Sequence, residues 1–146
     1  AGLHFFGEHG GMEVRTKDAD CLLSPRLEAV AAGTELADEL LEADWSFHPV
    51  DEFPVPGTSE TPDDKLPVLR LDPPDAPGWF LEVLGAHETG DQSARSFDRI
   101  ETEQGHFALA SFRYLALCES DPIETGVGVR IARPEAMALA NLLAHP

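Results

Sequence analysis

The run HFALASFRYLALC, residues 106–118, is the longest apolar stretch of the chain and decides the fold. As an extended strand it places Phe112 and Tyr114 on one face and Leu109 and Leu115 on the other. Because both faces are apolar, we expect one long strand near the centre of a sheet. The alternating segment 96–103 precedes it across a turn at Gln104-Gly105, which predicts that the two segments pair as a hairpin.

Further strands are predicted on both sides of this hairpin. The segments 66–71, 79–84 and 126–131 are rich in β-forming residues, 45–48 alternates, and 3–6 with 12–16 is expected as a hairpin of two short strands. Asp18-Ala19-Asp20 is expected as a turn. One helix is predicted to begin at Ser24-Pro25 and to break at Gly33, a second to begin at Thr34, and a last one to begin at Pro134.

Runs of strands between helices indicate an α+β fold rather than an alternating α/β fold. At 146 residues the chain is expected to form a single domain, 1–146. We predict a mainly antiparallel sheet of about six strands, with two or three helices packed on one face. The stretch 49–77 carries eight prolines, so we expect it to be irregular and to contain no central strand, although 66–71 can extend after Pro67.

Charge limits the classes of partner. The chain has 27 acidic and 10 basic residues and a formal net charge of -17. Such a charge repels nucleic-acid phosphates and anionic membrane surfaces, so neither direct nucleic-acid binding nor membrane binding is expected. The first residues lack the features of a signal peptide, and the two cysteines, Cys21 and Cys118, form no Cys-x-x-Cys pair. We therefore expect two reduced, buried thiols and a cytoplasmic location.

Acidic residues concentrate between Leu27 and Asp64, where eleven acids occur without a single Lys or Arg. In the helix expected after Thr34, three leucines share one face, and the opposite face is acidic and comprises Glu35, Asp38, Glu39, Glu42 and Asp44. Glu42 and Asp44 oppose the helix dipole at the end of this helix, which suggests a role other than helix stability. The alternative is an acidity shared by a whole proteome, whatever each protein does.

The densest cluster of metal-ligand types is His4, Glu8 and His9, with Glu13 beyond. Two imidazoles and a carboxylate are typical of a catalytic zinc or iron centre. The spacing matches no standard motif, however, and glycines rather than a helix surround it. The alternative is a hairpin rim with solvated histidines. No cofactor fingerprint and no nucleophile motif occurs, so we expect no cofactor.

Three other histidines lie near acids, as a general base requires, or else are surface imidazoles with a raised pKa. These groups are His48 with Asp51 and Glu52, His87 with Glu88 and Asp91, and His106 opposite Glu101 or Glu103. The aromatic residues around the proline-rich stretch favour ordinary sheet core over a pocket or an interface, and they are Trp45, Phe47, Trp79 and Phe80.

Two functions remain. The favoured hypothesis is a non-catalytic binding or regulatory domain that engages a basic protein partner through the acidic helical face, because charge complementarity raises association rates and suppresses wrong partners. The alternative is a small enzyme with a histidine/carboxylate or metal site near His4, Glu8 and His9. The identity of the partner, the oligomeric state and the strand order are left open by the sequence.

Overall fold

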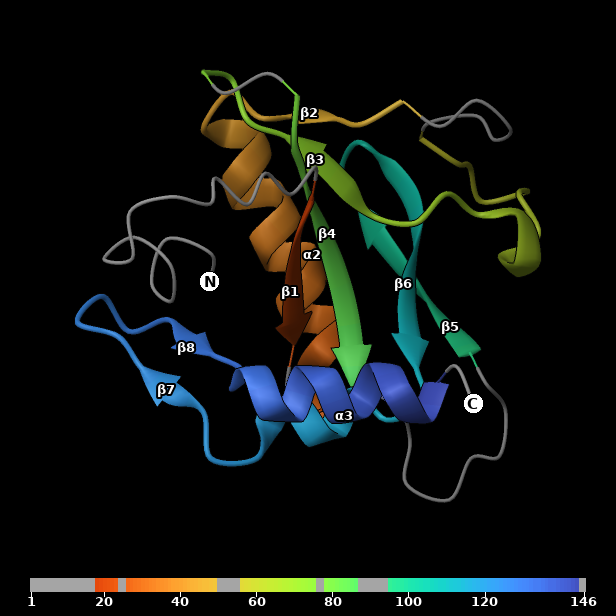
Figure 1. Ribbon diagram of the computed structural model, residues 1–146. Helices are drawn as coiled ribbons and strands as arrows, with labels where there is room; N and C mark the ends of the chain where they lie inside the picture. Colours follow the sequence, from red (N-terminus) through yellow and green to blue (C-terminus); the bar gives the residue numbers. More distant parts are fainter. Residues whose placement is uncertain (1–17, 24–25, 50–55, 76–77, 87–94, 145–146) are drawn as a thin grey trace.

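The computed structural model describes residues 18–23, 26–49, 56–75, 78–86 and 95–144. Within them the fold is α+β, with a six-stranded mixed sheet and two helices (Figure 1). The α+β class is confirmed, and the sheet is mixed, with three antiparallel and two parallel strand pairings. Its strands are β1 (Asp18–Leu23), β2 (Ser46–Phe47), β3 (Arg70–Asp72), β4 (Phe80–Ala86), β5 (Arg95–Thr102) and β6 (Gly105–Phe112).

The remaining elements are the helices α2 (Arg26–Glu42) and α3 (Pro134–Ala144), the short 3-10 helices η1 (Asp63–Lys65) and η2 (Leu115–Glu119), and a small hairpin of β7 (Ile123–Glu124) and β8 (Arg130–Ile131). The predicted strand over 126–131 is thus two residues long, and Val127 and Val129 beside it are exposed. None of the described helices is long and apolar enough to cross a bilayer.

The main sheet has the order β2-β3-β4-β6-β5, and β1 also pairs with β4. β1, β4 and β6 run parallel to one another, whereas β3 and β5 run antiparallel to their neighbours. The expected turn at 18–20 is wrong because these residues open β1 in register with the first half of β4. Their polar side chains fit this place since the first half of β1 is exposed.

The decisive apolar run lies where its pattern predicted, in an interior strand that pairs with β5 on one side and β4 on the other. It does not extend to Cys118. Both neighbouring strands also have their ends here. Ala86 is the last residue of β4, Arg95 is the first residue of β5, and both pair with Phe112. Beyond that point Tyr114 adopts a left-handed φ of 77° and turns the chain into η2.

The proline-rich stretch contributes one interior strand despite its prolines. β3 pairs with β2 and β4 and ends immediately before Pro73, which avoids the missing donor of proline within the ladder. The expectation of no central strand in 49–77 is therefore wrong for three residues. Leu69 connects the halves of the sheet, since its N–H donates to the Ala108 carbonyl and its own carbonyl accepts from Val83.

α2 covers one face of the sheet and contacts β1, β4 and β5 (Figure 1). The predicted break at Gly33 is wrong, because the helix is continuous over 26–42. At Gly33 the helix backbone approaches the sheet so closely that a Cβ atom would lie 2.9 Å from Ile100 Cδ1. The core between α2 and the sheet comprises Ala29 and Ala37 of the helix, with Leu69, Leu71, Val83, Ile100, Phe107 and Leu109.

α3 packs against η2 and lies across the end of the sheet toward which β1, β4 and β6 point (Figure 1). It does not lie on the face that α2 covers. Of the two helices, only α2 therefore packs on a face of the sheet, as predicted.

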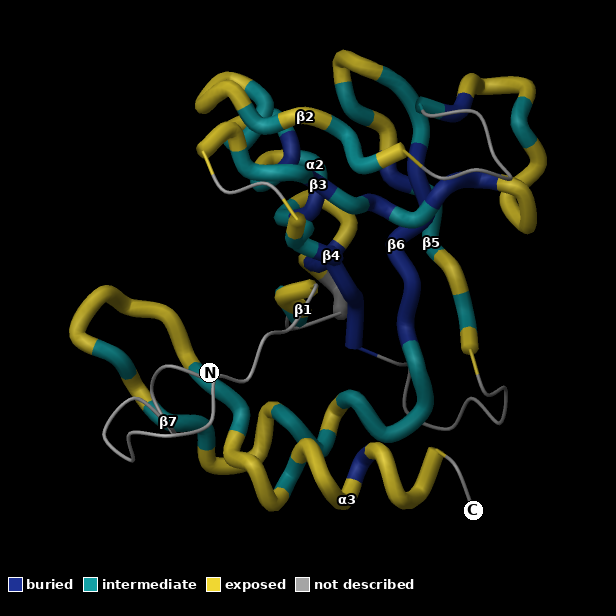
Figure 2. Tube along the Cα trace, turned by 45° about the horizontal axis from the view of Figure 1, so that its top comes forward, coloured by how far each residue is buried: buried dark blue, intermediate teal, exposed yellow. Residues whose placement is uncertain are grey.

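The aromatic residues Trp45 and Phe47 pack against the core, and Trp45 meets Trp79 edge to face at 5.9 Å. Figure 2 shows the buried residues concentrated in β4 and β6, in the interior of the sheet.

Candidate functional site

The outward side of α2 carries most of the acids that the sequence singled out. Glu35, Glu39 and Glu42 are exposed, Asp38 is half-buried, and Glu28 extends the same stripe two turns earlier. The spacing places these side chains opposite Ala29, Gly33 and Ala37, which face the sheet. We call the residues Glu28, Glu35, Asp38, Glu39 and Glu42 the acidic stripe. Its members share one helix face because of their spacing along the helix. The small residues on the opposite face allow α2 to pack closely on the strands.

Nothing in the described part of the chain neutralises the acidic stripe. No hydrogen bond or ion pair between described residues involves any of its carboxylates. The last turn of α2 contains no basic residue, although a helix C-terminus favours cations. Acids three and four positions apart, such as Glu35 with Glu39, also repel by a few tenths of a kcal/mol, about 0.2–0.5 per pair. The stripe therefore opposes the stability of its own helix.

Asp44 has a local structural reason for its position. It adopts a left-handed φ of 65° immediately after α2. Its N–H donates to the Leu41 carbonyl and the Trp45 N–H donates to the Leu40 carbonyl, the paired bonds of a Schellman helix end. Asp tolerates this backbone conformation better than most side chains. Asp44 is exposed and lies beside the acidic stripe, but helix termination alone accounts for its backbone.

Replacing Asp44 with glycine should stabilise the protein by about 0.5–1 kcal/mol, because glycine adopts the left-handed conformation without strain and removes a charge that opposes the dipole. Chemical denaturation followed by circular dichroism measures the change. Asp44→Asn separates the two causes, since it removes the charge and keeps a side chain. If Asp44→Ala were as stable as Asp44→Gly, the backbone argument would be wrong.

A second polar cluster lies on the sheet face that α2 does not cover. Backbone register aligns Arg70 of β3, Glu82 of β4 and Asp20 of β1 in one row, and the His48 N–H donates to the Arg70 carbonyl at its end. Arg70 Nε donates to Glu82 Oε2 at 2.8 Å, and Glu82 is only 8% exposed. The side chains point away from α2 because Leu71 and Val83, their sequence neighbours, are buried beneath that helix.

His48 is held by Asp72, a carboxylate that its sequence neighbourhood did not indicate. Its Nδ1 lies 2.6 Å from Asp72 Oδ1, and its ring packs on Phe80 at a centroid distance of 4.3 Å. The guanidinium of Arg70 lies over the same Phe80 ring, 5.1 Å from its centroid. Asp51 and Glu52, the expected partners, lie outside the described residues. The contact with Asp72 orients the imidazole and leaves Nε2 as the nitrogen that can meet solvent or a ligand.

Asp20 closes this row with a perturbed carboxyl. Desolvation, together with the nearby charges of Asp18 and Glu82, raises the pKa of Asp20, and the guanidinium of Arg70 opposes the rise.

Cys118 and Cys21 are both free thiols, and desolvation is the first cause that raises the pKa of each. A thiol with a raised pKa is a poor nucleophile at neutral pH, so neither cysteine has the character of a catalytic one.

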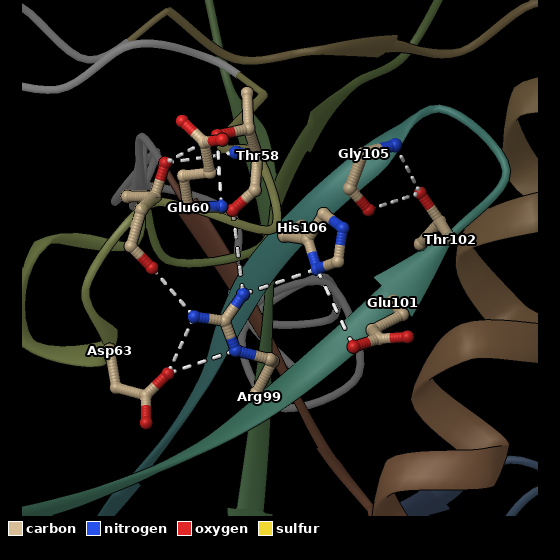
Figure 3. Close-up of polar contacts among 9 residues, drawn as sticks. Thr58, Glu60, Asp63, Arg99, Glu101, Thr102, Gly105 and His106 are labelled. Atoms are coloured by element: carbon tan, nitrogen blue, oxygen red, sulfur yellow. Dashed lines mark hydrogen bonds and ion pairs between the residues drawn. The ribbon is translucent and has the colours of Figure 1, made fainter.

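A third cluster centres on Arg99 and fastens a loop to β5 (Figure 3). Its Nη2 donates to the Thr61 carbonyl at 2.6 Å, and its Nε donates to Asp63 at 2.9 Å. Arg99 Nη1 lies 3.2 Å from His106 Nδ1. Glu101 Oε1 lies 3.7 Å from the same nitrogen. Strand register places His106 opposite Glu101 across the hairpin, as the sequence predicted.

The remaining expected sites fall elsewhere. His4, Glu8 and His9, and likewise His87 with Glu88 and Asp91, lie outside the described residues. Among the described residues no three His, Cys, Asp or Glu side chains are placed to hold a metal ion. The sequence predicted the acidic stripe but not the row of Arg70, Glu82 and Asp20.

No protein-family model, curated protein or solved structure matches this chain.

Proposed function

We propose that this chain is a non-catalytic binding or regulatory domain, and that it engages a basic protein partner through the acidic stripe of α2. The observation that carries the proposal is the contrast between two sets of acids. Glu82 is ion-paired with Arg70 at 2.8 Å, and Asp72 is hydrogen-bonded to His48 at 2.6 Å. The carboxylates of the acidic stripe have no such partner among the described residues. A cationic surface would supply the missing counter-charges.

The stripe also has the geometry of a docking surface. It lies on a continuous seventeen-residue helix whose opposite side is fixed to the sheet, so its carboxylates are presented on a rigid support. Preorganised charges lose little conformational entropy on binding and steer a partner of opposite sign during its approach. We further propose a cytoplasmic location, where free thiols such as Cys21 and Cys118 stay reduced.

The test compares two triple variants with the same change in net charge. Glu35→Gln, Glu39→Gln and Glu42→Gln neutralise the stripe, and Asp75→Asn, Glu103→Gln and Glu124→Gln neutralise three exposed acids elsewhere. The probe is a synthetic peptide of lysine, arginine and glycine, labelled for fluorescence anisotropy. At about 0.15 M salt, charges separated by more than roughly 8 Å are screened, so position should matter more than total charge.

The stripe variant should bind the peptide about tenfold more weakly, and the control variant less than about twofold more weakly. Binding of the unaltered protein should weaken as salt rises. The stripe variant should be at least as stable as the unaltered protein, because it removes like-charge pairs and acids at a helix C-terminus. Equal losses in the two variants would show that the peptide responds to total charge and would contradict the proposal.

A further inference from the structure

α3 is too apolar for the position it occupies. Its sequence PEAMALANLLA contains only Glu135 and Asn141 as polar side chains. A helix that is apolar all round belongs in the interior of a protein or of an assembly. In this structure only Ala140 of α3 is buried. The exposed apolar side chains of the helix are Met137, Leu139, Leu142 and Leu143.

The covered and the open sides of α3 differ in the size of their residues. The helix packs on η2, and the side centred on Ala140, which also holds the half-buried Ala136, is the covered one. The opposite side holds Glu135, Ala138 and Leu142, with Leu139 beside them, and Leu142 is 71% exposed. Figure 2 shows α3 exposed along most of its length at one end of the molecule. We call Ala138, Leu139 and Leu142 the apolar stripe.

Local charge indicates what covers this surface. The segment 113–144 has three basic and four acidic residues, which are Arg113, Arg130, Arg133, Glu119, Asp121, Glu124 and Glu135. The segment 26–44, by contrast, has six acids against one arginine. Two copies of a chain with a net charge of -17 repel one another over most of their surface, and the segment that carries α3 adds only -1 to this charge. A basic partner has no reason to prefer this nearly neutral region, and an anionic membrane has no basic residues on the stripe to bind.

We propose that the apolar stripe of α3 is a dimer interface with a second copy of this chain. The contact is isologous, so Leu139 and Leu142 of one copy meet the same residues of the other around a two-fold axis. Ala138 lets the two helix backbones approach closely. An eleven-residue helix is about 16 Å long, and pairing two of them buries roughly 800–1,000 Å² in total. This is below the roughly 1,200–2,000 Å² of a stable interface and in the range of a weak, transient one, so we expect a Kd of about tens of micromolar.

The dimer is independent of the proposed function, and salt separates the two. Salt screens the repulsion between two acidic copies, so dimerisation should strengthen between about 0.15 and 0.5 M salt. Binding of a basic peptide to the acidic stripe should weaken over the same range. A result that contradicts one of the two proposals therefore leaves the other standing.

Analytical ultracentrifugation of the full chain from about 5 to 500 µM, with a reducing agent present, provides the test. The unaltered protein should show a monomer–dimer equilibrium. Leu142→Glu should weaken it more than about 30-fold, because two buried carboxylates would face each other across the axis. Val30→Glu is the matched control: Val30 is an exposed apolar residue on α2, and its replacement adds the same charge away from α3. The control should weaken dimerisation less than about threefold.

Leu142→Met provides a conservative variant that should keep the dimer, and circular dichroism melting shows whether each variant is folded. Concentration-dependent amide chemical shifts should be confined to α3 and η2. A protein that stays monomeric at 500 µM in both salts would overturn the proposal and would leave the stripe to another protein or to further chain. A dimer that Leu142→Glu and Val30→Glu weaken equally would overturn it as well.

Discussion

Gly33→Val should destabilise the protein by about 3 kcal/mol, the largest effect expected from a single residue of α2. A Cβ atom at this position would lie 2.9 Å from Ile100 Cδ1 and 3.2 Å from Leu23 Cδ1. Ile100 is fully buried in the core, so a shift of its Cδ1 also displaces the residues packed around it. Valine adds two further methyl groups to this contact, and α2 must then lift from the sheet. Denaturant unfolding measures the loss, and the unfolding slope shows whether the variant still folds cooperatively.

A double-mutant cycle separates the close approach from helix propensity. Alanine favours a helix over glycine by about 1 kcal/mol, so Gly33→Ala on a helix with free space would be stabilising. Here we expect a net loss of about 1 kcal/mol, since the new Cβ meets Ile100 Cδ1. Ile100→Val removes that atom, and in its background Gly33→Ala should become neutral or stabilising. Additive effects of the two substitutions would show that Gly33 is not a contact residue.

Gly33 also explains why one sequence-based expectation was wrong. Local propensity treats a glycine within a helical pattern as a break, and the expected second helix began at the next residue. The actual requirement is tertiary, because α2 crosses β5 and β1 at a point where no side chain fits. The sequence contains no local sign of that crossing. The same limit applies to β1, whose acidic first half resembles a turn until it is paired with β4.

The candidate sites differ in how far the sequence could predict them. The acidic stripe was predicted because helical periodicity is local, and the outward position of Glu35 and Glu39 follows from it. The contact between His48 and Asp72 spans 24 residues, so sequence neighbourhood indicated other acids. A usable signal did exist for Arg70 and Glu82. Each is the lone charge of a predicted strand, Arg70 in 66–71 and Glu82 in 79–84, and opposite charges of this kind often pair across strands.

Arg70→Met should destabilise the protein by about 2–3 kcal/mol at neutral pH, and the loss should shrink on acidification. Methionine keeps most of the volume over the Phe80 ring, so the change removes mainly the charge. Glu82 is nearly buried and would lose the guanidinium at 2.8 Å that compensates its carboxylate. The range is below that of a fully buried pair because the Arg70 side chain is 30% exposed.

The pH dependence follows from Asp20. Its pKa is raised, first by desolvation and then by Asp18 and Glu82, and Arg70 counteracts the rise. A carboxyl whose pKa is raised in the folded state binds its proton more tightly there, so its ionisation costs stability as pH rises. Without Arg70 the pKa of Asp20 rises further, and this cost grows at pH 7. Protonation removes the cost, so the stability difference between the unaltered protein and Arg70→Met should narrow from pH 7 toward pH 4.

Urea unfolding of both proteins across this pH range measures the difference directly. Glu82→Gln provides the control, because in its background Arg70 no longer has a buried carboxylate to compensate. Arg70→Met should then cost less than about 1 kcal/mol, which gives a coupling of roughly 1–2 kcal/mol for the pair. Arg70→Met that destabilises equally at pH 4 and pH 7, in either background, would mean that Arg70 acts through packing on Phe80. The carboxylate of Glu82 would then gain no more from its counter-charge than the unpaired carboxylates of the acidic stripe. The contrast that supports a basic partner at α2 would be lost.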